Sequence, residues 1–212
     1  MFENRQKESK ERDFPDDKVI YVDPYTNRSY TWAQVKTTAT EFGKGLRGLW
    51  DWQKGDVLAL FTPNCIDTPA ITWGTHFAGG VLSPANPGYT EEELAYQLKD
   101  SGAKGLITQM AHLDIAVKAA KKVGIPEDRI ALMGDEKHPT GKFKHFTNVR
   151  NISGTQRFRR AKVDPDRDLA FLVYSSGTTG LPKVSTLALL GECRLLIKYR
   201  VSCCRTGTSW PT

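Results

Sequence analysis

Long apolar runs and a secretory leader are both missing from this chain of 212 residues. No apolar stretch approaches the roughly 18 residues that a membrane-spanning helix needs. The opening residues Met1–Glu8 contain no apolar segment of the kind that precedes a secretory cleavage site. We therefore expect no integral membrane segment and no signal peptide. Internal repeats and low-complexity segments are absent too, which excludes a repeat architecture.

Cysteine and histidine are scarce, with four of each. Cys65 stands alone, whereas Cys193, Cys203 and Cys204 all lie close to the C-terminus. No cysteine spacing resembles a zinc site, and the adjacent pair is a poor disulfide framework. The histidines have no catalytic motif around them, so we expect none of them to act as a general base.

Basic residues exceed acidic ones, with 30 Lys and Arg against 24 Asp and Glu and a formal charge of +6. The only dense basic cluster with an aromatic residue is Arg157–Arg160. An excess of this size is typical of solvated surface, and we expect no nucleic-acid partner. Charged residues at 25% and aromatics at 10% are ordinary for a globular chain. The composition therefore predicts a packed core rather than disorder.

Helix and strand signals alternate from Asp16 to about Ser175, which predicts an α/β fold. Two helix starts carry capping boxes, one formed by Thr31 with Gln34 and one by Thr90 with Glu93. The expected helices are Thr31–Leu49, Asp67–Ala78, Thr90–Asp100 and His112–Val123, and the expected strands are Asp56–Phe61, Val81–Pro84, Gly105–Thr108, Arg129–Met133 and Leu169–Tyr174.

The hydrophobic period disappears between Gly134 and Asp168. Proline and glycine punctuate this basic, polar stretch, so we expect a long surface connector rather than a separate domain. Order returns at Leu169–Tyr174, an apolar run typical of a strand that is covered on both faces.

A loop rich in glycine and hydroxyl side chains follows this strand directly, with the sequence Ser175-Ser176-Gly177-Thr178-Thr179-Gly180-Leu181-Pro182-Lys183. Glycine lets a backbone come close to a ligand, hydroxyl and amide groups donate to oxyanions, and a lysine adds a point charge. The loop therefore suits a polyphosphate, although it lacks the spacing of a Walker A motif. A plain Gly/Ser/Thr linker is the alternative, which the position after a buried strand and the ending in Pro-Lys make less favourable.

Two stretches make the sequence resemble the adenylate-forming enzymes, which include acyl- and aryl-CoA ligases, luciferase-like enzymes and peptide-synthetase adenylation domains. Tyr174–Lys183 is similar to the phosphate loop of that family, with the acidic lead-in Asp164–Asp168 before it. Ser83–Thr90, followed by Glu93–Leu94 and Gln97–Ser101, is similar to the 4-coumarate:CoA ligase-like branch. The resemblance implies an incomplete N-terminal part of the large domain of these enzymes, with a mostly parallel sheet and flanking helices.

The family implies a two-step reaction in which ATP and a carboxylic acid give acyl-AMP and pyrophosphate, and coenzyme A then takes the acyl group. ATP, Mg²⁺ and coenzyme A are the implied cofactors, and a small carboxylic acid is the implied substrate. No catalytic residue or metal ligand is carried over. The residues expected to hold the ATP phosphates are Ser175, Ser176, Gly177, Thr178, Thr179, Gly180 and Lys183.

The family pattern stops after Lys183, where Val184–Ser185 is what a splice donor translates to. Regrouping the codons of Arg200–Thr212 by one base permits the family's usual continuation, Gly-Val-Met-Leu-Ser-His-Arg-Asn. We therefore expect two parts: 1–183, a partial AMP-dependent synthetase/ligase N-terminal domain that ends at the phosphate loop, and 184–212, an aberrant tail formed by a retained intron and a frame-shifted exon. The alternative is a genuine variant segment with a helix over Leu187–Tyr199.

The expected function is that of a fragment of an AMP-forming acid–CoA ligase that is inactive as this chain. A non-catalytic fragment that binds a nucleotide or a partner is the alternative. The expected location is the cytoplasm. A peroxisomal address stays open for a full-length form, because we expect the natural C-terminus to be missing. The present ending, Trp210–Thr212, is no such signal.

Overall fold

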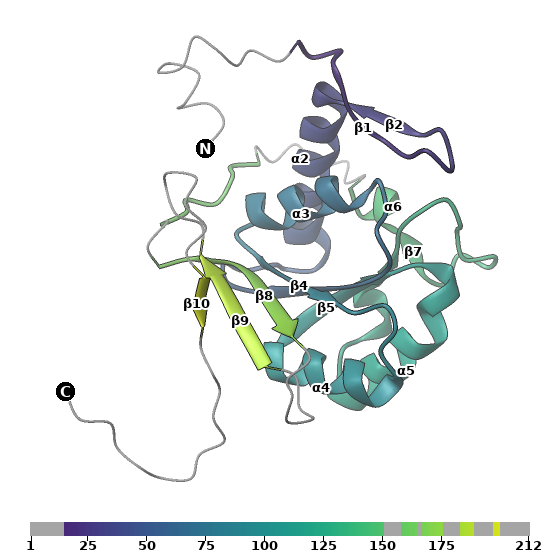
Figure 1. Cartoon of the computed structure of the whole chain (residues 1–212), viewed down its shortest axis with the longest axis vertical. Coiled ribbons are helices and arrows are strands. Elements are labelled where there is room, and N and C mark those ends of the chain that lie inside the picture. The colour runs from purple at the N-terminus through teal and green to yellow at the C-terminus, as the bar shows by residue number, and fades with distance from the viewer. Residues whose placement is uncertain (1–14, 151–157, 165–166, 176–182, 189–196, 200–212) are drawn as a thin grey trace.

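The computed structural model describes residues 15–150, 158–164, 167–175, 183–188 and 197–199 (Figure 1). Strands and helices alternate along these ranges as the sequence predicts. The strands are β1 (Val19–Val22), β2 (Ser29–Thr31), β3 (Val57–Phe61), β4 (Val81–Ala85), β5 (Ala103–Thr108), β6 (Ile130–Leu132), β7 (Lys144–His145), β8 (Leu169–Ser175), β9 (Lys183–Ala188) and β10 (Ile197–Tyr199). The helices are α2 (Trp32–Leu49), α3 (Thr68–Phe77), α4 (Glu91–Ser101), α5 (Leu113–Val123) and α6 (Phe146–Arg150).

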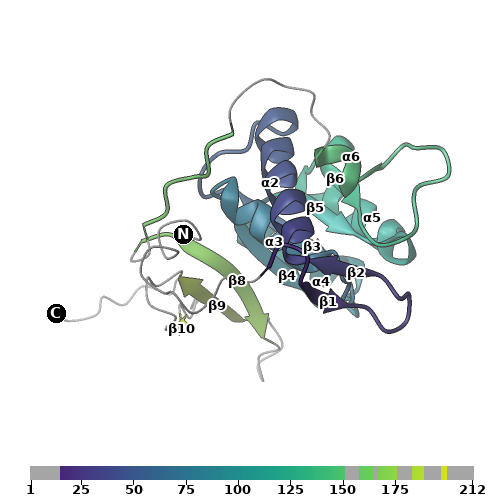
Figure 2. The same cartoon turned by 90° about the horizontal axis from the view of Figure 1, so that it is seen from above.

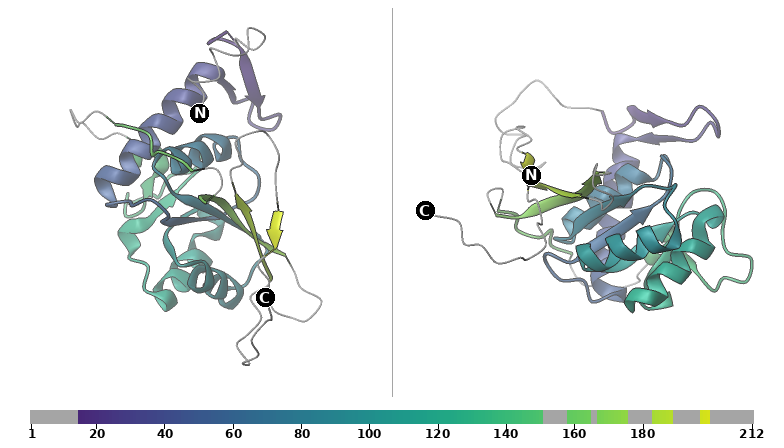
Figure 3. Two further views of the ribbon diagram at one scale, coloured as in Figure 1. Left: turned by 90° about the vertical axis from the view of Figure 1, so that its left-hand side faces the viewer. Right: turned by 60° about the horizontal axis from the view of Figure 1, so that its bottom comes forward.

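One large sheet has the strand order β10-β9-β8-β4-β3-β5-β6-β7. The six strands from β8 to β7 in this order run parallel to one another. Strand β9 is antiparallel to β8, and β10 is antiparallel to β9. The predicted mostly parallel sheet with flanking helices is therefore confirmed. A separate antiparallel hairpin of β1 and β2, which the sequence analysis does not predict, lies beside the start of α2 (Figure 3).

Both predicted capping boxes are present. The Thr31 hydroxyl accepts a hydrogen bond from the Gln34 amide, and the Gln34 side chain accepts one from the Thr31 amide. Thr90 and Glu93 make the same reciprocal pair at the start of α4. Because such boxes satisfy amides that no helical carbonyl reaches, they fix where each helix begins. At the other end of α4, Gly102 adopts φ of 64°, a left-handed conformation that ends the helix.

The core has two layers, one on each face of the sheet (Figures 1 and 2). Side chains of β3 alternate between them, with Leu58 and Leu60 on the side of α2, α3 and α6, and Ala59 and Phe61 on the side of α4 and α5. Every residue of β3 is buried, as expected for a central parallel strand between two helix layers.

The prediction of a surface connector between Gly134 and Asp168 is wrong for residues 144–150. These residues form β7 and α6, and Phe146 and Val149 are buried at 1% and 0% exposure against α2. Strands and helices this short leave almost no hydrophobic period to detect. Residues 158–164 do run without regular structure, along α2 and α3.

Strand β8 is confirmed, but the prediction that both its faces are covered is wrong. Leu169 is 39% exposed and Phe171–Tyr174 are only half-buried, whereas Ala170 is buried. The strand that carries the phosphate-loop sequence is therefore the least covered of the parallel strands with three or more residues.

Candidate phosphate-binding site

The loop sequence begins where β8 ends. Ser175 is the last residue of β8, Lys183 is the first residue of β9, and the two are paired in register. The intervening site residues Ser176, Gly177, Thr178, Thr179 and Gly180 lie outside the described residues. The two ends of the loop are thus held side by side at the carboxyl edge of the parallel strands. In open α/β sheets, ligands bind in the crevice outside this edge.

Polar contacts bring together the two stretches that resemble the ligase family. The Ser83 hydroxyl donates to the Leu172 carbonyl at 3.3 Å, which joins β4 to β8. The Tyr174 hydroxyl donates to the Asp100 carboxylate at 2.7 Å, which joins β8 to α4. Burial, together with the neighbouring Asp100 carboxylate, raises the pKa of Tyr174, so its hydroxyl stays a donor at neutral pH.

Gln97 completes this network and is fully buried. Its side-chain amide donates to the Ser83 hydroxyl at 2.9 Å and to the Pro84 carbonyl at 3.1 Å. Gln97 belongs to a stretch that resembles the ligase branch, but no contact was predicted for it, although a signal was present. Gln97 lies three residues after Leu94 and one before Leu98, so it occupies the face of the helix that the apolar pattern turns inward.

A pocket of about 240 Å³ lies at the carboxyl ends of β3, β5 and β6. Arg28 lines it and forms an ion pair with the buried Asp67 carboxylate at 2.6 Å and with the exposed Asp135 at 2.8 Å. The Tyr30 hydroxyl and the Gly134 amide also donate to Asp67. These bonds join the β1–β2 hairpin to the body of the fold, so we assign Arg28 and Asp67 a structural role.

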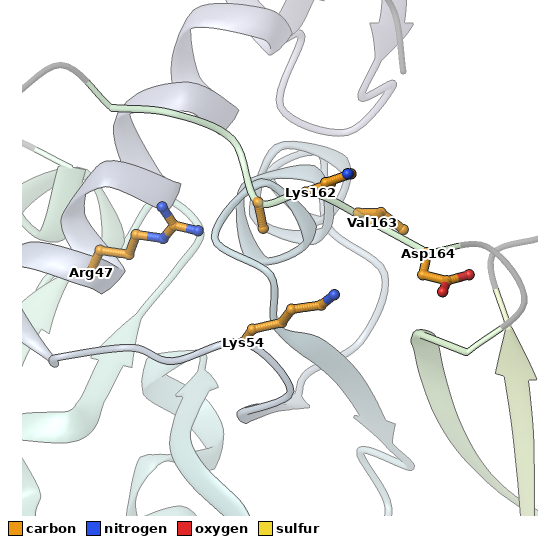
Figure 4. A pocket seen from close by; sticks show the side chains of 6 residues that line it. Arg47, Lys54, Lys162, Val163 and Asp164 are labelled. Atoms are coloured by element: carbon orange, nitrogen blue, oxygen red, sulfur yellow. The ribbon is translucent and has the colours of Figure 1, made fainter.

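A basic hollow of about 670 Å³ lies at the opposite, amino-terminal edge of the sheet (Figure 4). Arg47, Lys54 and Lys162 contribute its positive charge. The Arg47 guanidinium donates to the carbonyls of Ala78 and Arg159, and the Lys54 ammonium forms an ion pair with Asp168 at 2.7 Å. Two of the three cations therefore hold Arg159 and Asp168 against the fold, and the hollow is separate from the loop ends at the carboxyl edge.

Two of the histidines have structural roles. His76 is 6% exposed, and its Nδ1 bonds to the Gly80 carbonyl at 3.2 Å. His145 is equally buried, and its Nε2 bonds to the Gly134 carbonyl at 2.8 Å. Burial lowers the pKa of both imidazoles.

We expect acid to destabilise the chain through these histidines. Because the folded pKa of each lies below the usual value near 6.5, the unfolded chain binds more protons as the pH falls through about 6.5, and stability falls with it. Urea unfolding at pH 7.5 and 5.5 should show that the difference in free energy of unfolding between the wild type and His76→Asn is smaller at the lower pH. A parallel loss in both proteins would contradict the assignment to His76.

The part of the chain that the structure describes was searched for metal-binding clusters and for membrane-spanning helices. None of its His, Cys, Asp and Glu side chains cluster in a group that would hold a metal ion. None of its helices has the length and apolar character to cross a bilayer.

An open parallel sheet with a glycine- and hydroxyl-rich connection at its carboxyl edge is the architecture of α/β nucleotide-binding domains. Comparison with known families makes the assignment more specific. The chain belongs to the AMP-binding enzyme family, whose model matches residues 7–188.

Its relatives include CoA ligases. The chain is 37% identical to phenylacetyl-CoA ligase epaB of Aspergillus niger, over 79% of this chain and 32% of the relative. It is 33% identical to 4-coumarate-CoA ligase 1 of Narcissus pseudonarcissus, over 79% of this chain and 29% of the relative. The crystal structure of the anthranilate CoA ligase AuaEII in complex with anthranoyl-AMP superposes with a TM-score of 0.71 at 25% identity, covering 82% of this chain and 32% of that chain.

The chain thus spans about a third of the length of the relatives that it matches. The resemblance to the CoA ligase branch of the adenylate-forming enzymes is confirmed, and so is the fold class as an incomplete part of that enzyme domain.

Proposed function

We propose that this chain is the phosphate-binding N-terminal part of an AMP-forming carboxylic acid–CoA ligase. The observation that carries the proposal is the register pair of Ser175 and Lys183, which closes the loop at the carboxyl edge of the sheet. The donor set fits a triphosphate, since it combines hydroxyls, two glycines and one lysine. Bound ATP supplies the adenylyl group that activates the acid.

The part played by this chain's own residues is positioning and charge neutralisation. The hydroxyls of Ser175, Ser176, Thr178 and Thr179 would donate to the β- and γ-phosphate oxygens, and the Lys183 ammonium would offset charge as pyrophosphate leaves. Gly177 and Gly180 would let the backbone approach the phosphates. Magnesium commonly binds through phosphate oxygens and water, so it needs few protein ligands here.

The 212 residues by themselves do not complete this reaction in our proposal, because they span about a third of the ligases they resemble. The same observation favours the second candidate, a non-catalytic fragment that binds a nucleotide or a partner. A small carboxylic acid and coenzyme A are substrates proposed for the longer enzyme, and the cytoplasm is its proposed location.

We expect the purified chain to bind Mg·ATP at millimolar concentration and to catalyse no ATP–pyrophosphate exchange with a panel of aryl and fatty acids. Calorimetry should give an affinity that Lys183→Ala weakens about tenfold, which is the loss of one charge-assisted hydrogen bond. Lys118→Ala, an exposed lysine of α5, is the matched control and should bind as the wild type does.

Clear exchange above background would overturn the proposed inactivity. Equal weakening by both lysine variants would instead indicate non-specific attraction of ATP to a basic chain.

We also propose that residues 184–212 are translated from a retained intron followed by a frame-shifted exon. The support is the departure from the family pattern after Lys183 and the codons of Arg200–Thr212, which regroup to restore it. The family match ends inside this segment, at residue 188. Residues 187–188 and 197–199 are in strands, so the alternative helix over Leu187–Tyr199 is not formed there. Sequencing the transcript tests the proposal, which fails if no message lacks the intron.

A further inference from the structure

The second half of α4 contacts β8 immediately before the phosphate loop. We propose that Gln97 and Asp100 are positioning residues, which hold the end of β8 and thereby the loop ends Ser175 and Lys183 at the place where the ATP phosphates bind. The inference rests on the proposed function and extends it to residues of another element, outside the loop.

Backbone pairing alone holds β8 weakly against β4. Register pairing between these strands is confined to Leu82 with Phe171, whereas β3 and β4 are paired along their whole length. Pro84 in β4 has no amide hydrogen to give to a neighbouring strand. Side-chain hydrogen bonds therefore supply the link between β4 and the far half of β8.

The first link is a relay from Gln97 through Ser83 to Leu172. The Pro84 carbonyl can only accept, so the Gln97 amide must direct its NH₂ group toward Pro84 and Ser83. The Ser83 hydroxyl is then free to donate to the Leu172 carbonyl of β8. The Gln97 Oε1 atom is buried and has no partner among the described residues. The Gln97 side chain therefore makes two donor bonds at the cost of a buried oxygen that has lost its contact with water.

The second link is the bond from the Tyr174 hydroxyl to the Asp100 carboxylate. Tyr174 is the residue directly before Ser175, the last residue of β8, so this bond holds the strand one residue ahead of its end. A hydrogen bond to a charged acceptor is among the stronger kinds in proteins. The two links contact β8 at two nearby places, the Leu172 carbonyl and the Tyr174 side chain.

We expect Tyr174→Phe to speed amide hydrogen exchange at Val173–Ser175 about tenfold and to leave the amides of β3 unchanged. Gln97→Leu, which keeps the volume and removes the donors, should also loosen Leu172 and its neighbours. Asp100→Asn keeps an acceptor for the Tyr174 hydroxyl but removes its charge, so it should speed exchange less than Tyr174→Phe does. Tyr25→Phe is the matched control, because Tyr25 is 95% exposed.

An unchanged exchange rate at Val173–Ser175 would overturn the inference. Equal acceleration in β3 would overturn it as well, since it would show a general loss of stability. Mg·ATP binding adds a second readout, in which Tyr174→Phe should weaken affinity several-fold at an unchanged melting temperature. If the wild type binds no Mg·ATP, the proposed function fails, and the exchange rates still decide the positioning role.

Discussion

Asp67→Ala should lower the free energy of unfolding by about 3 kcal/mol, the largest loss that we expect from a single polar substitution in this chain. The Asp67 side chain is fully buried and accepts bonds from the Arg28 guanidinium at 2.6 and 3.2 Å, from the Tyr30 hydroxyl at 2.8 Å and from the Gly134 amide at 3.2 Å. Truncation leaves all these donors without their common acceptor. Since the Arg28 side chain is 33% exposed and water reaches it, we expect the low end of the range for broken buried pairs.

Asp135→Ala is a control that uses the same arginine. Asp135 forms the other ion pair of Arg28, but its side chain is 54% exposed, and exposed pairs contribute about 1 kcal/mol or less. Urea unfolding of the two variants should therefore separate clearly. Similar losses would mean that burial of Asp67 does not set the strength of the pair. A small loss for both would show that the hairpin of β1 and β2 docks by apolar contact alone.

Helices and strands were predicted correctly where a short stretch of sequence contains the whole signal. The capping boxes at Thr31 and Thr90 involve residues three positions apart, so a short window contains the whole motif. Apolar runs such as Val57–Phe61 are long enough to indicate buried strands. The strands and helix that were missed are all six residues or shorter: β1, β2, β7, α6, β9 and β10. Of these, β1 is largely exposed. Such short elements are stabilised by contacts with the rest of the fold and not by their own local sequence.

The candidate site also has a part that a short stretch of sequence predicts and a part that it does not. Composition and order within Ser175–Lys183 were enough to predict a phosphate loop, and that prediction stays untested because residues 176–182 lie outside the described ranges. The residues that support the loop come from far along the chain, with Asp100 separated from Tyr174 by 74 positions. Asp67 and Arg28 are 39 apart. A carboxylate and its partner at such distances leave no mark on a sequence window, and only the packing of α4 and α3 against the sheet brings them together.

Gly74→Ala should lower the free energy of unfolding by about 2 kcal/mol, although alanine is the better helix former. Helices α2 and α3 cross where Gly43 and Gly74 face each other. A Cβ atom on Gly74 would lie 2.7 Å from the Ala39 carbonyl oxygen and 2.7 Å from the Phe42 ring, and one on Gly43 would lie 2.6 Å from the Gly74 carbonyl oxygen. Real Cβ atoms do not come so close, so the helices must separate.

Gly48→Ala, in the same helix as Gly43, is the control for this substitution. Gly48 is exposed in the last turn of α2, and the change there should be neutral or stabilising by up to about 1 kcal/mol. Chemical denaturation of both variants measures the difference. If Gly74→Ala proved as harmless as Gly48→Ala, the two helices would have room to move apart. Helix α3 connects the carboxyl end of β3 to the amino end of β4. A movement of α3 away from α2 would therefore also loosen β4, whose Ser83 bonds to Leu172 of β8.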